Sequence, residues 1–90
     1  MLIYLVYKIT YTTQALKVLL RMPRNSAQLI REKLEQIAVD PFASFPNAKK
    51  LHGRPGYRLR IGDWRVIYEI EKDQLVVIVL KIATRGDVYR

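Results

Sequence analysis

The sequence predicts an α+β fold in which a helical hairpin packs on one face of an antiparallel sheet, with the elements in the order β-α-α-β-β-β. Apolar residues recur at three- and four-residue steps between residues 15 and 39, as in helices that cover a core. From residue 57 onwards they alternate with a period of two, as in half-buried strands. With 90 residues and 50% hydrophobic content, the chain can form one core, so we expect a single domain over residues 1–90.

The first half of the chain is predicted to hold one strand and two helices. Residues 2–10 are rich in β-branched and aromatic side chains, and we expect this strand inside or beside the core. A capping hydroxyl within residues 11–14 precedes a short helix over residues 15–22, which Pro23 ends. A second helix is expected over residues 24–39, where the apolar side chains share one face.

The second half is predicted to be a loop followed by three strands. Residues 40–56 hold three of the four prolines and two of the four glycines, which indicates an irregular surface segment. Residues 57–61 and 64–70 flank Gly62-Asp63, a pair that suits a two-residue hairpin turn. Residues 75–83 are almost continuously apolar, which predicts a central strand buried on both faces.

The two-residue turn sets the register of this hairpin and separates its side chains by face. Arg60 then lies opposite Arg65, and Ile61 opposite Trp64. The apolar face, expected to meet the helices, collects Tyr57, Leu59, Ile61, Trp64, Val66, Tyr68 and Ile70. The other face collects Arg58, Arg60 and Arg65, although neighbouring like charges destabilise a sheet. This face is either a solvated basic surface or an anion site, since guanidinium groups bind phosphate bidentately.

Charge and composition narrow the function. Sixteen Lys and Arg against eight Asp and Glu give a net charge of +8, which favours a polyanionic partner such as nucleic acid, an anionic membrane surface or an acidic protein segment. Without cysteine there is no disulfide framework, thiolate site or Cys nucleophile, and one His argues against an imidazole metal site. We therefore expect no metal or other cofactor. No charge-free run approaches the ~18 residues of a membrane span, so we expect a soluble, cytoplasmic protein with no membrane partner.

Three motifs together resemble the RelE branch of the RelE/ParE superfamily of bacterial and archaeal toxins. The segment KKLHGRPGYRLRIGDWRVIYEI at residues 49–70 is similar to the family signature. Residues 22–25 (MPRN), 30–37 (IREKLEQI) and 40–42 (DPF) resemble the family's second helix and its exit. Residues 84–89 (TRGDVY) look like the C-terminal motif in which an Arg precedes a Val-Tyr pair by three residues. The resemblance covers nearly the whole chain and implies a RelE-like fold.

The resemblance also implies an activity and its partners. RelE-type toxins belong to type II toxin-antitoxin systems and are ribosome-dependent endoribonucleases that cut mRNA in the A site, thereby inhibiting translation. The 2′-hydroxyl attacks the adjacent phosphorus, which gives a 2′,3′-cyclic phosphate and a 5′-hydroxyl without a metal. The implied partners are the ribosome, mRNA and a cognate antitoxin protein that holds the toxin inactive.

By the same resemblance, the catalytic residues are Arg58, Arg60, Arg65, Arg85 and Tyr89. Arg60 and Arg65 are the best candidates to bind the scissile phosphate, because the hairpin register places them side by side. Arg58 and Arg60 fall at positions that are often Lys in relatives, and a guanidinium is a poor proton acceptor. The general base is then Tyr89, whose phenolate neighbouring cations favour, and Arg85 is the leaving-group acid or its electrostatic substitute. Apart from the resemblance, the alternative for Tyr89 is an aromatic that only stacks on a base or packs the C-terminus.

Other basic residues have less specific predicted roles. Lys49, Lys50, His52 and Arg54 are expected to contact ribosomal or messenger RNA. His52 has the alternative of acid–base work. The facing of Lys81 stays open, because a one-residue change in the loop at residues 71–74 moves it to the other face of the sheet.

Two rival functions remain at this point. A ParE-like toxin shares the fold but acts on DNA gyrase and lacks the constellation of arginines and tyrosine. A non-catalytic nucleic-acid-binding module is supported by the charge alone.

Overall fold

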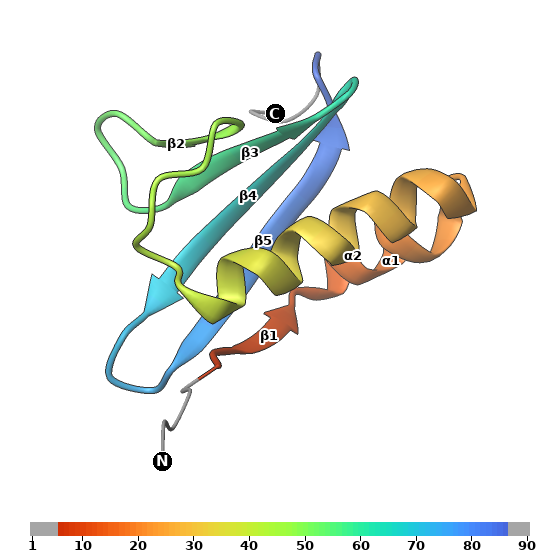
Figure 1. Ribbon diagram of the computed structural model, residues 1–90. Coiled ribbons are helices and arrows are strands. Elements are labelled where there is room, and N and C mark those ends of the chain that lie inside the picture. Colours follow the sequence, from red (N-terminus) through yellow and green to blue (C-terminus); the bar gives the residue numbers. More distant parts are fainter. Residues whose placement is uncertain (1–5, 87–90) are drawn as a thin grey trace.

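In the computed structural model, which describes residues 6–86, two helices pack on one face of a five-stranded sheet (Figure 1). The elements are β1 (Lys8–Tyr11), α1 (Thr13–Arg21), α2 (Arg24–Val39), β2 (Ala48–Lys50), β3 (Tyr57–Ile61), β4 (Trp64–Glu71) and β5 (Val76–Thr84). This arrangement confirms the predicted fold class. Residues 2–5 of the predicted first strand lie outside the described residues, and the strand itself begins at Lys8.

Local sequence signals set both helices. The Thr12 hydroxyl accepts a hydrogen bond from the Ala15 N–H at 3.2 Å and thereby caps α1. Met22 is extended because it precedes Pro23, and α1 ends there. α2 spans the predicted residues, and its predicted apolar face is buried at Ala27, Ile30, Leu34, Ile37 and Ala38.

The sheet, with strand order β1-β5-β4-β3-β2, is mixed rather than wholly antiparallel. β1 pairs in parallel with β5, so the antiparallel prediction is wrong for this one pair. The chain crosses from β1 at one edge to β2 at the other through the two helices (Figure 1). It then meanders back through β3 and β4, and β5 arrives beside β1 running in the same direction.

β2 lies within the segment that the sequence predicts to be irregular. Its three residues pair antiparallel with β3, from Ala48 opposite Leu59 to Lys50 opposite Tyr57. So short a strand has no hydrophobic period of its own, and its conformation depends on the β3 edge that it joins.

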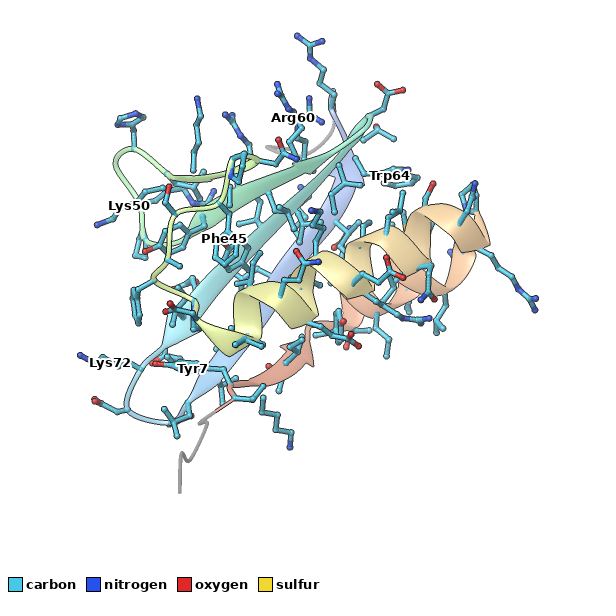
Figure 2. The ribbon with its side chains drawn as sticks, viewed as in Figure 1. Tyr7, Phe45, Lys50, Arg60, Trp64 and Lys72 are labelled. Atoms are coloured by element: carbon cyan, nitrogen blue, oxygen red, sulfur yellow. The ribbon has the colours of Figure 1, made fainter. Side chains whose placement is uncertain are left out.

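The β3–β4 hairpin has the predicted register, with Arg60 opposite Arg65 and Ile61 opposite Trp64. Gly62 has a φ of +56°, which a two-residue turn with glycine in its first position requires. The predicted apolar face is confirmed, since its residues are either buried in the core under the helices or packed against it. In Figure 2, Trp64 lies on the helix side of the sheet and Arg60 on the other side.

An irregularity in β5 settles the facing of Lys81. Ile67 pairs with Lys81 and Tyr68 pairs with Val79, so Leu80 is an extra residue in the ladder. Because Lys81 is the partner of Ile67, and Ile67 is the partner of Arg58, Lys81 belongs to the arginine face.

The predicted central place of β5 is confirmed, but its predicted burial on both faces holds only in part, with Ala83 buried on the face away from the helices. Val77, Val79 and Ile82 are buried beneath the helices, whereas Val76, Ile78 and Leu80 are only partly buried. Both helices lie on the same side of the sheet, so the other side keeps contact with water (Figure 1).

Within residues 6–86, no helix has the length and apolar character needed to cross a bilayer.

Candidate anion-binding site

The sheet face away from the helices carries four arginines, which we call the arginine cluster: Arg58 and Arg60 on β3, Arg65 on β4 and Arg85 just beyond β5. The first three share this face through the hairpin register. The Arg85 N–H donates to the Asp63 carbonyl at 2.9 Å, which extends the β4–β5 ladder by one position. Side chains alternate along a strand, so Arg85 joins Ala83 and its partner Arg65 on this face. The fold thus brings Arg58 and Arg85, which are 27 positions apart in the sequence, onto one face.

Arg65 is the anchored member of the cluster. Its side chain is only 9% exposed, and it is the one charged residue buried among residues 6–86. Its Nη1 atom donates to the Gly62 carbonyl at 2.9 Å and to the Trp64 carbonyl at 3.0 Å. Both acceptors belong to the β3–β4 turn, so the turn fixes the plane of the guanidinium. Nε and Nη2 carry three further N–H donors of the same rigid fork.

Electrostatics couple the four arginines. The pKa of Arg65 is lowered from its ordinary value, mainly by burial and then by the positive charges of Arg60, Arg85 and Arg58, while Asp63 acts in the opposite sense. An arginine remains protonated at neutral pH even so. The cluster can therefore stabilise negative charge, but its guanidinium groups are not suited to accept a proton.

Two hollows continue the positive surface from the cluster towards β2. The smaller, of about 60 Å³, is lined by Pro46, Asn47, Lys49, Arg58 and Arg60. The larger, of about 350 Å³, which we call the loop hollow, is lined by Lys49, Lys50, Leu51, His52, Arg54 and Arg58. The two share Lys49 and Arg58, so the predicted RNA-contacting residues border the arginine cluster.

Sequence reasoning missed Asn47 and left the facing of Lys81 open, and one of its predicted site residues, Tyr89, lies outside the described residues. Asn47 lines the smaller hollow, and its carbonyl accepts from the Arg60 N–H at 2.9 Å. Its place beside the cluster follows from β2, which begins at the next residue and which the sequence pattern does not predict. Lys81 reaches this face through the irregularity at Leu80, which no local pattern signals. Tyr89 lies beyond the described residues.

Residues 6–86 bring no three His, Asp or Glu side chains together as a possible metal site.

Solved structures share this fold. The RelE–RelB complex from Pyrococcus horikoshii contains a chain 28% identical, with a TM-score of 0.74 over 92% of this chain and 99% of that one. The RelBE2 toxin-antitoxin complex from Mycobacterium tuberculosis gives 22% identity and a TM-score of 0.74, covering 92% and 95%. The YoeB/ParE toxin from Agrobacterium tumefaciens gives 16% and 0.74, covering 86% and 96%. The last two show likeness of fold alone.

Among curated proteins, none matches the sequence. A family model does match it: the one described as the ParE toxin of type II toxin-antitoxin systems, parDE, covers residues 9–89. That span includes both helices, the sheet except Lys8 at the start of β1, and the arginine cluster. The chain therefore belongs to the ParE toxin family, within the RelE/ParE superfamily, as the toxin of a type II toxin-antitoxin system.

Proposed function

We propose that this toxin is a metal-independent endoribonuclease that cleaves mRNA in the ribosomal A site and so inhibits translation. The observation that supports it most is the gathering of Arg58, Arg60, Arg65 and Arg85 on one face of a hydrogen-bonded sheet. Attack by a 2′-hydroxyl on phosphorus builds up negative charge in the transition state. Preorganised cations stabilise such charge without reorganising at the moment of reaction.

The proposed roles combine the positions of the arginines with the family resemblance, which alone assigns Tyr89. Arg60 and Arg65 are cross-strand partners and would hold the two non-bridging oxygens of the scissile phosphate. Arg58 would add charge from the neighbouring position on β3. Tyr89 would take the 2′-hydroxyl proton, and Arg85 would stabilise or protonate the leaving 5′-oxygen.

The proposed partners are a cognate antitoxin, the ribosome and mRNA. The Pyrococcus and Mycobacterium relatives were solved as complexes with antitoxins, which supports an antitoxin for this chain. The net charge of +8 favours both an acidic protein segment and ribosomal RNA as partners.

A ParE-type activity against DNA gyrase is the second candidate, because the matching family model is the ParE toxin. This candidate gives the arginine cluster no chemical duty. Substitutions within the cluster would then leave toxicity unchanged unless they unfold the protein.

The deciding experiment maps new 5′ ends on translated mRNA after brief induction of the wild type, Tyr89→Ala, Arg85→Ala and the control Arg21→Gln, a change on α1. We expect new ends inside coding regions for the wild type and the control, and none for Tyr89→Ala and Arg85→Ala.

Growth arrest that persists in those two variants contradicts the catalytic assignment. Gyrase inhibition without new mRNA ends supports the second candidate. Cleavage of naked mRNA at the same sites contradicts ribosome dependence.

A further inference from the structure

The loop that forms part of the larger hollow is anchored to the sheet at its base. The Leu51 N–H donates to the Gly56 carbonyl at 2.9 Å and closes the loop at residues 51–56. Gly56 has a φ of +107°, and a Cβ atom there would lie 2.9 Å from the Tyr68 carbonyl oxygen. Glycine therefore lets the loop lie directly on β4. The backbone of the loop is consequently anchored where it leaves β2 and where it enters β3.

The loop hollow opens on the face of the arginine cluster. Leu51, which lines it, packs against Ile67 and Ala83 on the sheet. These two residues are the cross-strand partners of Arg58 and Arg65. Since cross-strand partners share a face, the hollow and the cluster face the same way.

We propose that the loop hollow is a second phosphate subsite, which binds the phosphodiester of a nucleotide flanking the scissile one in single-stranded RNA. This inference rests on the proposed endoribonuclease function. From Arg85 beyond β5 to Lys49 on β2 the cations span three interstrand steps, about 14 Å at ~4.8 Å each. That length exceeds one phosphate group, so an extended strand lying across it places neighbouring phosphates on successive cations.

The lining of the hollow favours RNA over an antitoxin segment. Five of its residues carry cationic or imidazole nitrogen, and Leu51 is the only apolar one. Carbon atoms of Leu51 and of the long Lys and Arg side chains make up most of its exposed lining, so what favours RNA is the number of charged groups and not a lack of apolar surface. Phosphate groups bind where cationic side chains converge, as they do around this hollow.

The test measures binding of RNA that cannot be cleaved, carrying a 2′-O-methyl group at the attacking position. A dinucleotide and a hexanucleotide are titrated into the wild type and Lys49→Gln/Arg54→Gln across a salt series; Lys49 lines the hollow and, as the partner of Arg58, lies on the face of the arginine cluster. The control is Lys17→Gln/Arg21→Gln, which removes the same charge from α1 on the helix side of the sheet. We expect the first variant to bind the hexanucleotide about tenfold more weakly, with the salt slope reduced by about 1.4, and the dinucleotide as the wild type does.

Three results would overturn the subsite. The first would be that the hexanucleotide binds the wild type no more tightly than the dinucleotide does. The second would be that the control loses as much affinity for the hexanucleotide as the loop variant. The third would be that the loop variant keeps its RNA affinity and loses only antitoxin binding. Length-dependent binding that depends on Lys49 and Arg54, in a protein that produces no mRNA ends on ribosomes, would instead uphold the subsite and contradict the proposed function.

Discussion

At the scale of single residues, Arg65 differs from the other members of the arginine cluster because the backbone holds it. Two turn carbonyls accept from its Nη1, whereas Arg60 beside it is exposed. A lysine at position 65 could not present a planar fork while bound to the turn. We expect Arg65→Lys to lower mRNA cleavage in a translation extract at least tenfold, as is typical for lost transition-state donors. Arg60→Lys should lose less, and equal losses would show that the anchoring is unimportant.

The buried ring of Tyr68 predicts how stability depends on pH. Burial, with a smaller contribution from Tyr57, raises its pKa to about 12, and the two rings stack with centroids 5.3 Å apart. The unfolded chain ionises this group near its ordinary pKa of 10.0 while the folded state keeps it neutral. The free energy of unfolding is therefore unaffected by Tyr68 below pH ~10 and falls between about pH 10 and 12.

Urea unfolding across that pH range tests this account. Tyr68→Phe should flatten the decline in the free energy of unfolding, because phenylalanine has no proton to release. Tyr11, whose pKa burial also raises, contributes to the decline that remains. An identical slope in the wild type and Tyr68→Phe would contradict the assignment.

At the scale of elements, the loop at residues 51–56 offers a matched pair of glycines. Gly53 and Gly56 both have positive φ, +71° and +107°, but only Gly56 lies against other atoms. Both alanine substitutions incur backbone strain, of order 1–3 kcal/mol. Gly56→Ala adds the clash with the Tyr68 carbonyl and should therefore be the more destabilising in urea titrations. Equal losses would mean that the loop is not seated on β4 as described.

The elements also show how far sequence reasoning reaches. The bounds of α2 and the turn and register of the β3–β4 hairpin could be predicted to the residue, since helical periodicity and a Gly-Asp turn are local signals; β4 runs one residue further than predicted, to Glu71. The register then placed Arg60 beside Arg65. β2, the parallel β1–β5 pair and the extra Leu80 depend on contacts between distant segments, and no local pattern encodes them. For this reason the facing of Lys81 could not be derived in advance.

At the scale of the whole molecule, the concentrated positive charge of the arginine cluster lowers the free energy of unfolding while it serves the proposed cleavage. Arg60 and Arg65 are direct partners, and like charges in that position repel by several tenths to about 1 kcal/mol. We expect Arg60→Gln to raise the free energy of unfolding by a similar amount at low salt while lowering cleavage. Chemical unfolding at low and high ionic strength checks this, because salt should reduce the gain. A loss of stability at low salt would contradict it.

The parallel pairing of β1 with β5 has a consequence for the order in which the chain can fold. Tyr11 and its partner Val79 are 68 residues apart, whereas β3, β4 and β5 follow one another through short turns. Contacts that close long loops form late and slow the folding reaction. During synthesis, β1 leaves the ribosome before its partner strand exists, so it stays unpaired until β5 has been made. The sheet is therefore completed only when translation has passed β5, and Arg85 follows immediately after it.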